Sequence, residues 1–329
     1  MERISLGHFP TPIEKLNGLP LNPGQHLYVK RDDFSGLEVS GNKIRKLEYC
    51  LAEARALGAD TIVTTGAIQS NHCRATAAAS ARLGFACELI LRGTVDQIEG
   101  NLFLELALGA SVHVIAPDRD RNQYIAAFLD RLKRDGKKPY FIPVGASNAT
   151  GSFGYGECYK EILVQEKQLG IRFDAIALAV GSGGSYAGLY YENEKNNGSK
   201  AILGFAVADS AELFKQEIAH ILQAMHERSG EKPSDPAGFY LNDAYVGAGY
   251  AVSTAAEIDF ILNVAKKTGL ILDPCYTGKA FRGLYTEMMS GRFAAFRHVL
   301  FVHTGGLFGW TRKNRDEAMQ NLHTGLNIE

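Results

Sequence analysis

The sequence predicts an α/β protein with two lobes, each an open, mostly parallel twisted sheet covered by helices. Three observations predict this class. Short apolar runs typical of buried strands alternate along the chain with longer amphipathic stretches typical of helices. The hydrophobic share, 46% of 329 residues, is enough for one large domain or two separate cores. No fixed-period repeat or low-complexity tract interrupts the alternation.

The predicted strands are apolar runs bounded by polar or glycine-containing turns. In chain order they are Leu27–Lys30, Thr61–Thr65, Ala86–Arg92, Ser111–Ala116, Tyr140–Val144, Ala175–Val180, Ile202–Ala208 and Val299–His303. The predicted helices show apolar residues at a helical spacing. They are Lys43–Leu57, Asn71–Leu83, Ile98–Leu108, Gln123–Asp135, Gly154–Leu169, Gly184–Asn193, Ala211–His226 and Thr254–Lys267. In such folds the strand carboxyl ends and the helix N-termini meet at one edge, where ligands bind.

Two polar stretches divide the chain. Val144–Gly154 is rich in Gly, Ser and Asn, and Asp32–Asn42 reads as a polar turn. Between them lies a small domain of residues 45–152, and residues 1–44 together with 153–329 form a large domain. Glu231–Gly238 is expected to be an exposed loop.

The composition excludes several classes of function. Lys and Arg number 35 against 36 Asp and Glu, a net charge of −1, and no basic run carries interleaved aromatics, so no nucleic-acid partner is expected. The start of the chain lacks the apolar core of a signal peptide, and no apolar stretch could span a bilayer. Five scattered cysteines show no zinc-binding spacing. We therefore expect a cytoplasmic protein with reduced thiols, no metal and no membrane partner.

Lys43 is the leading functional candidate. It stands where Ser40-Gly41-Asn42 gives way to a predicted helix. A lysine amine partly removed from water becomes nucleophilic and can bond covalently to an aldehyde cofactor. Taken alone, a solvated capping lysine is the plainer interpretation, so the hypothesis depends on the other polar stretches.

Two turns that follow predicted strands are typical of anion sites. Gln69–His72 is a polar run at the start of an alanine-rich helix, where free N–H groups suit a carboxylate. An ordinary N-cap explains Ser70 or Asn71, but not four polar residues in succession. Gly181–Ser185 can turn backbone N–H groups towards a phosphate, although it matches neither the P-loop nor GxGxxG and a plain glycine turn is the alternative.

Polar aromatic residues and a late Gly-Gly pair complete the candidates. Tyr276, in a polar turn, and Tyr250, in a glycine turn, could transfer protons if their pKa were lowered, although a packing tyrosine explains either one alone. Thr304-Gly305-Gly306 ends the last predicted strand, where two glycines permit the close approach of a flat ring; a simple terminal turn is the alternative.

Taken together, these stretches resemble the pyridoxal-phosphate enzymes of the tryptophan-synthase-β fold type. Within that type the chain looks like the branch that holds D-cysteine desulfhydrase and 1-aminocyclopropane-1-carboxylate (ACC) deaminase. The resemblance extends from Thr11 to Gly306, and the segments around Lys43 and Asn71 are specific to the branch. The matching stretches are Ser40–Glu48, Gly66–Asn71, Gly181–Ser185, Asp273–Lys279 and Thr304–Gly306.

The resemblance assigns a role to each candidate. Lys43 holds pyridoxal 5′-phosphate as a Schiff base and accepts the Cα proton. The catalytic set is Lys43, Ser70, Tyr250 and Tyr276, and the substrate-binding set is Ser70, Asn71 and His72. The cofactor-binding set is Lys43, Asn71, Gly181, Ser182, Gly183, Gly184, Ser185, Thr277 and Thr304, with Asn71 on the ring 3′-oxygen and the glycine loop on the phosphate.

Three departures separate the two activities of the branch. Deaminases carry Glu after the second tyrosine, Leu before the late Gly-Gly pair and usually Gln after the Ser-Asn pair, whereas this chain has Thr277, Thr304 and His72. A glutamate would keep the pyridine nitrogen protonated and strengthen the electron sink that ring opening needs. Threonine hydroxyls give a weaker, neutral interaction, which suits loss of a good β-leaving group.

The resulting hypothesis is a homodimeric lyase that eliminates the β-group of D-cysteine to give pyruvate, hydrogen sulfide and ammonia. ACC deaminase is the nearest alternative, and elimination from cysteate, D-serine or an L-amino acid stays open, as does substrate handedness. Arg45 and Arg74 are candidate contacts for a sulfonate, with a solvated helix face as the simpler interpretation. A metabolite-binding α/β protein without catalysis is the alternative from another class, but it gives no role to Lys43, Ser70 and Tyr276 together.

Overall fold

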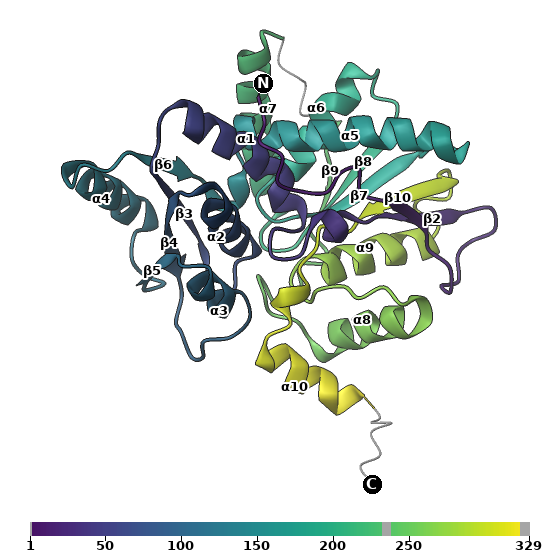
Figure 1. The fold of residues 1–329 in the computed structure, drawn as a ribbon. Coiled ribbons are helices and arrows are strands. Elements are labelled where there is room, and N and C mark those ends of the chain that lie inside the picture. Colours follow the sequence, from purple (N-terminus) through teal and green to yellow (C-terminus); the bar gives the residue numbers. More distant parts are fainter. Residues whose placement is uncertain (1, 232–237, 323–329) are drawn as a thin grey trace.

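The computed structural model describes residues 2–231 and 238–322, which fold around two sheets (Figure 1). The large sheet has the strand order β1-β2-β10-β7-β8-β9 and is parallel except for β1, which pairs antiparallel with β2. The small sheet has the order β5-β4-β3-β6 and is parallel throughout. The predicted fold class is confirmed.

All eight predicted strands are present, and two short strands were not predicted. The large sheet contains β1 (Ile13–Lys15), β2 (His26–Lys30), β7 (Ala175–Val180), β8 (Ala201–Ala206), β9 (Tyr240–Asn242) and β10 (His298–Val302). The small sheet contains β3 (Thr61–Ala67), β4 (Ala86–Arg92), β5 (Ser111–Ile115) and β6 (Pro139–Ile142). The unpredicted strands β1 and β9 are the two edges of the large sheet and have only three residues each, too few to show a pattern.

Helices cover both faces of each sheet. Those on the small sheet are α1 (Asn42–Ala56), α2 (Asn71–Leu83) and α3 (Gly100–Ala107) on one face and α4 (Arg121–Arg134) on the other. Those on the large sheet are α5 (Ala149–Leu169), α6 (Gly184–Lys195) and α7 (Ala211–Ser229) on one face and α8 (Ala255–Thr268) and α9 (Thr277–Met289) on the other. Successive strand residues alternate between the faces: Ile62 packs beneath α1 and α2, and Val63 packs beneath α4.

Two helices differ from the prediction because they contain glycines where backbones approach closely. The Val144–Gly154 stretch was expected to be a break, but α5 already begins at Ala149. A side chain at Gly154 would come within 2.1 Å of the Arg45 carbonyl, so this glycine lets α5 pack against α1. The whole of α9 was missed; its Gly278 and Gly283 face Ile261 and Phe205 at distances that leave no room for a Cβ. Glycine weakens the helical signal in a sequence although packing requires it here.

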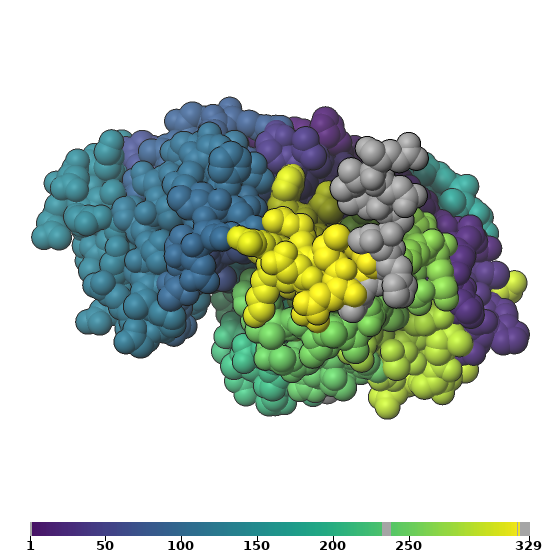
Figure 2. All heavy atoms as spheres, turned by 90° about the horizontal axis from the view of Figure 1, so that it is seen from below, coloured from purple at the N-terminus to yellow at the C-terminus, as the bar shows by residue number. Residues whose placement is uncertain are grey.

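The C-terminal segment connects the two sheets. Helix α10 (Arg312–Asn321), which was not predicted, packs against α8, and its first residue donates backbone hydrogen bonds to both carboxylate oxygens of Glu99, just before α3, at 3.0 Å. Figure 2 shows this helix lying across the junction between the atoms of the small sheet and those of the large sheet. The carboxyl edges of β3 and β7 therefore face one shared space.

The proposed boundaries of the small domain fall inside α1 and α5, at residues 45 and 152, and the division into two domains remains a proposal. Most of the predicted Glu231–Gly238 loop, residues 232–237, lies outside the described residues. Among the helices that the structure describes, none combines the length and apolar character that a membrane crossing requires.

Candidate active site

Lys43 lies in the first turn of α1, held against the end of β10 by the turn before it. Gly41 has φ +78°, and a Cβ there would lie 2.5 Å from the Thr304 carbonyl oxygen, so only glycine fits. The Lys43 amine donates a hydrogen bond of 3.0 Å to the Asn42 side-chain oxygen. Burial lowers the pKa of Lys43 to about 8, and the carboxyl group of Asp273 partly opposes the shift. The amine is therefore poised to react near neutral pH.

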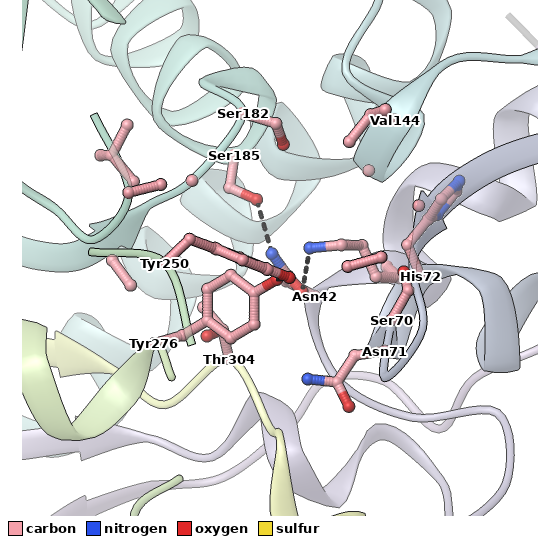
Figure 3. A pocket seen from close by; sticks show the side chains of 18 of the residues that line it. Asn42, Ser70, Asn71, His72, Val144, Ser182, Ser185, Tyr250, Tyr276 and Thr304 are labelled. Carbon is pink, nitrogen blue, oxygen red and sulfur yellow. Dashed lines mark hydrogen bonds between the residues drawn. The ribbon is translucent and has the colours of Figure 1, made fainter. Parts of the chain in front are cut away.

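Lys43 faces a cavity of about 360 Å³ between the two sheets. Its walls come from the carboxyl ends of β3, β4, β6, β7, β8 and β10, which explains how residues far apart in sequence meet (Figure 3). Of the predicted site residues, the lining includes Lys43, Ser70, Asn71, His72, Gly181, Ser182, Gly183, Ser185, Tyr250, Tyr276 and Thr304. Gly184 adjoins them in the chain as the first residue of α6. Thr277 is not in the lining.

The N-terminus of α2 forms one wall. Ser70 is its N-cap and accepts a hydrogen bond from the backbone N–H of Cys73 at 3.2 Å, so the capping interpretation holds. No described residue accepts a hydrogen bond from the backbone N–H of Asn71 or His72. These free donors, the Ser70 hydroxyl and the positive end of the helix dipole suit a substrate carboxylate.

The His72 ring is engaged elsewhere. The Thr64 hydroxyl donates to the Ile142 carbonyl at 2.7 Å, so its oxygen accepts from Nε2–H of His72, 2.8 Å away. Burial holds the pKa of His72 well below its usual value, and the ring is neutral. Only the backbone of His72 is therefore available to a substrate carboxylate.

Behind the glycine loop that lines the opposite end of the cavity, donors converge on one oxygen. The Lys46 amine (3.1 Å) and the Gly184 backbone N–H (3.2 Å) both donate to Oγ of Ser147, which lies 2.8 Å from Oγ of Ser182. Lys46 is fully buried without a carboxylate partner among the described residues, and this burial lowers its pKa. An ammonium group, a helix N-terminus and hydroxyls around one point are suited to a phosphate.

Sequence reasoning missed Lys46 and Ser147. The available signal for Lys46 was its position three residues after Lys43, on the same face of a helix. Ser147 gave no such signal, because it contacts the glycine loop 35 residues later only through the packing of the two sheets.

Two tyrosines form the third wall. The hydroxyl oxygens of Tyr250 and Tyr276 lie 2.5 Å apart, and the Lys43 amine lies 5.9 Å from the centre of the Tyr276 ring. Figure 3 shows the two rings side by side over the cavity. Burial raises the pKa of both phenols, so the lowered pKa expected from the sequence is wrong for both, and each is a neutral hydroxyl that keeps its proton at neutral pH.

The two threonines near the late glycines lie in different environments. Thr277 is fully buried; its hydroxyl donates to Oδ1 of Asp273 at 2.6 Å and accepts from the Asp273 backbone N–H at 2.8 Å. Thr304 borders the cavity. Gly306 has φ +109°, and a Cβ there would lie 2.6 Å from the Asp273 carboxyl carbon. Only glycine therefore allows the chain after β10 to pack this closely against Asp273. Thr304 is thus better placed than Thr277 to reach a bound ring.

Arg45 and Arg74 were candidates for a sulfonate contact, with a solvated helix face as the preferred interpretation; the structure contradicts both, because neither arginine is on a solvated face or in the cavity lining. Both are almost completely buried. Arg45 forms ion pairs with Asp32 and Glu161 at 2.8 and 2.9 Å. Arg74 donates to the side-chain oxygen of Asn101 at 3.0 Å. The basic residues that do line the cavity, besides Lys43, are Arg92 and Arg121.

Within the described ranges 2–231 and 238–322, no three His, Cys, Asp or Glu side chains gather in a way that could hold a metal ion. All five cysteines are free thiols.

Comparisons with known proteins agree with this arrangement. Residues 4–305 match the family described as pyridoxal-phosphate dependent enzymes. The chain is 41% identical to the bifunctional D-cysteine desulfhydrase/1-aminocyclopropane-1-carboxylate deaminase, mitochondrial, of Arabidopsis thaliana, over 93% of this chain and 78% of that protein. It is 37% identical to the D-cysteine desulfhydrase of Yersinia enterocolitica, over 92% of this chain and 93% of that protein.

Other relatives carry the deaminase name. A putative 1-aminocyclopropane-1-carboxylate deaminase of Thermotoga maritima is 39% identical, over 95% of this chain and 99% of that protein. The crystal structure of an ACC deaminase homologue superposes with a TM-score of 0.87 at 34% identity, over 98% of this chain and 96% of the other.

Proposed function

The chain belongs to the pyridoxal-phosphate-dependent enzyme family, and from this premise we propose that it converts D-cysteine to pyruvate, hydrogen sulfide and ammonia. The Cβ–S bond breaks with its electron pair on sulfur, and one water replaces the amino nitrogen at Cα, so that one D-cysteine and one water balance the three products. The observation that carries the proposal is the Lys43 amine, with its pKa near 8, between a carboxylate-binding helix end and two protonated phenols.

The residues fit the cofactor. Lys46, Ser182 and the N-terminus of α6 would hold the phosphate, and Lys43 would bond to the aldehyde. Bound pyridoxal phosphate supplies a ring that accepts the electrons left when a Cα proton departs. Lys43 then removes that proton, since a lysine with a lowered pKa is an effective base near neutral pH.

Ser70 and the free N–H groups of Asn71 and His72 orient the substrate carboxylate, while Tyr276 gives a proton to the departing sulfur. The hydroxyl of its partner Tyr250 lies 2.5 Å away, and Tyr250 is the more exposed residue of the two (37%). Two phenols sharing one hydrogen bond leave one proton free to donate.

The environment of Thr304 supports β-elimination over opening of a cyclopropane ring. Asp209 is the one carboxylate in the cavity lining among the described residues, and it follows β8. Thr304 follows β10, and strand β7 lies between β8 and β10. About two strand spacings, roughly 10 Å, therefore separate Asp209 from Thr304. A neutral hydroxyl near the ring nitrogen leaves a weaker electron sink, which suffices for thiolate loss.

The test combines turnover and covalent labelling. Purified protein should form pyruvate from D-cysteine, and borohydride treatment should fix a pyridoxyl group on Lys43. Lys43→Ala should lose both, whereas Lys133→Ala, with its side chain 63% exposed on α4, should keep both. Full turnover by Lys43→Ala would refute the proposal. ACC turnover to 2-oxobutanoate at an efficiency equal to that for D-cysteine would make the deaminase assignment the better one.

Arg92 and Arg121 favour a second candidate, elimination from an amino acid whose β-substituent is anionic. Along the small sheet the cavity passes from β6 at the phosphate end to Ala67 on β3, then to Arg92 on β4 and to Arg121 after β5. Arg92 thus ends, and Arg121 follows, a strand beyond β3 in the small sheet, and the Arg92 guanidinium donates to the Pro117 carbonyl. Arg121 has no hydrogen-bond or ion-pair partner among the described side chains.

Cysteate distinguishes this candidate, because its sulfonate leaves as sulfite with the same pyruvate and ammonia products. If it is the substrate, Arg121→Gln should lower kcat/KM for cysteate about tenfold and leave that for D-cysteine unchanged. Arg119→Gln, a neighbouring arginine that stacks on Tyr124, should change neither. Equal losses for both substrates would exclude a sulfonate contact.

We also propose that the enzyme is a homodimer in the cytoplasm. The five free thiols support a reducing compartment, and the resemblance to the branch supports the dimer. Light scattering on the eluting peak of a sizing column, at a mass of about twice 35.8 kDa, would support the dimer, and a monomer mass would exclude it.

A further inference from the structure

A row of hydrogen bonds runs from Arg74 through Asn101 to Asn71 at the cavity. Nε of Arg74 donates to Oδ1 of Asn101, and Nδ2 of Asn101 donates to Oδ1 of Asn71, each at 3.0 Å. The same Nδ2 donates to the backbone carbonyl of Gln69, also at 3.0 Å. Arg74 and Asn101 are buried, at 1% and 0% exposed.

Chemistry allows only one orientation of this row. A guanidinium has donors and no acceptor, so the Asn101 oxygen must face Arg74. A carbonyl has only acceptors, so the Asn101 amide nitrogen must face Gln69 and, with it, Asn71. The Asn71 side chain can then present only its oxygen to Asn101. Its amide nitrogen is left to face the cavity, as Figure 3 shows, and no described residue accepts from it.

We propose that Arg74 and Asn101 are positioning residues that hold the Asn71 amide with its nitrogen towards the cofactor. This inference rests on the proposed role of Asn71 as the donor to the ring 3′-oxygen. An asparagine amide turns over at little steric cost, and the reversed amide would present an oxygen to a negatively charged oxygen. The row therefore determines whether Asn71 attracts or repels the cofactor.

Asn101→Asp reverses the row with almost no change in volume. Aspartate still accepts from Arg74, as an ion pair, but has no proton for Asn71. The Asn71 amide then turns to donate to position 101, and its oxygen faces the cavity. We expect pyridoxal phosphate to bind the apoprotein about 10- to 100-fold more weakly, the size of a lost hydrogen bond to a charged group.

A spectroscopic readout reports the same change. Without a donor the 3′-oxygen retains more negative charge and holds a proton on Lys43 Nζ more tightly. The pH midpoint of the visible absorbance of the bound cofactor should therefore rise in Asn101→Asp. The melting temperature of the apoprotein should stay within a few degrees of wild type, because the new ion pair with Arg74 offsets the lost hydrogen bonds.

Two variants separate orientation from charge. Asn101→Leu removes the row without adding charge, leaves the Asn71 amide free to turn, and should weaken cofactor binding by a smaller factor of about three to ten. Asn122→Asp adds the same charge on the exposed face of α4 and should have no effect. A defect in Asn101→Asp together with wild-type binding in Asn101→Leu would overturn the proposal, because charge alone would then be the cause.

Asn71→Ala distinguishes failure of this inference from failure of the proposed function. If Asn71→Ala weakens cofactor binding and neither Asn101 variant does, the row is structural only and the inference fails. If Asn71→Ala binds the cofactor as wild type does, the assigned role of Asn71 is wrong, and the inference falls with it while Lys43 labelling can still stand.

Discussion

Arg45 and Arg74 both follow an active-site residue closely in the chain, and both are buried, but they are paired differently. The guanidinium of Arg45 forms four hydrogen bonds of 2.8–2.9 Å to the carboxylates of Asp32 and Glu161. That of Arg74 meets only neutral acceptors, an amide oxygen and the backbone carbonyl of Glu38. Arg45 is thus paired directly with carboxylates, whereas Arg74 orients neutral dipoles, and the carboxyl groups of Glu105 and Glu38 act on its charge without a direct hydrogen bond.

The carboxyl groups nearest to the two arginines differ in hydrogen bonding in the same way. Asp32 accepts from Arg45, Thr11 and Tyr155, and despite burial the charge of Arg45 lowers its pKa to about 2. Glu105, near Arg74, has no hydrogen-bond partner for either oxygen among the described residues, and burial raises its pKa to about 9. A buried charge is stable where hydrogen bonds compensate it and is suppressed where they do not.

The largest expected effect is loss of the Arg45 pair. Arg45→Met leaves Asp32 and one side of Glu161 without their main partner, and breaking a buried ion pair in this way costs about 3–5 kcal/mol of unfolding free energy. Arg74→Met removes donors only from neutral groups and should cost about 1–3 kcal/mol. Urea unfolding of both variants measures the difference. Equal losses would remove the contrast between the two arginines.

The next effect concerns Glu105. Its pKa is raised above 4.5 in the folded protein, so this group favours folding fully below pH 4.5 and does so progressively less as the pH rises towards about 9. At pH 7 the raised pKa of Glu105 lowers the free energy of unfolding by about 3 kcal/mol relative to its value below pH 4.5. Glu105→Gln should recover about this amount at pH 7 and little at pH 4.5, measured by urea unfolding at both values. A gain that does not depend on pH would refute the assignment.

Asp32 provides the control with the opposite sign. Its pKa is lowered in the folded protein, so its stabilisation is present above pH 3.8 and is lost as the pH falls through about 2. Asp32→Asn should therefore lose stability at neutral pH and approach wild type in strong acid, whereas Glu105→Gln differs from wild type most on the alkaline side.

The sequence predicted the elements whose pattern is local. Central parallel strands such as β3 and β7 were found because nearly all of their residues are buried, which gives a continuous apolar run. The residues at strand carboxyl ends, such as Ser70, Gly181 and Thr304, were found because parallel topology brings those ends together. Helix α9 was missed because its glycines serve packing against Ile261 and Phe205, which sequence spacing does not reveal.

What could not be predicted depends on partners distant in the chain. Arg45 donates to Glu161, which lies 116 residues later in the chain. The Thr277 hydroxyl points inwards because it donates a hydrogen bond to the buried Asp273 carboxylate. His72 looked like a polar active-site side chain, but its ring bonds Thr64. In each case the sequence singled out the right residue, but the direction of its side chain is determined by a buried hydrogen-bond acceptor or donor that the sequence does not show.

The smallest expected effect tests whether the charge of Arg74 reaches Lys43. Burial is the main cause of the lowered Lys43 pKa, and the positive charge of Arg74 contributes a further part. Arg74→Gln should therefore raise the pKa of Lys43 from about 8 by a few tenths of a unit. At pH 7 only about a tenth of the Lys43 amine is neutral, so the rate at which apoprotein captures pyridoxal phosphate should fall by roughly a factor of two. The rate measured across pH gives the midpoint directly. Arg74→Lys keeps the charge and should keep the midpoint; if it shifts the midpoint as Arg74→Gln does, geometry rather than charge links Arg74 to Lys43.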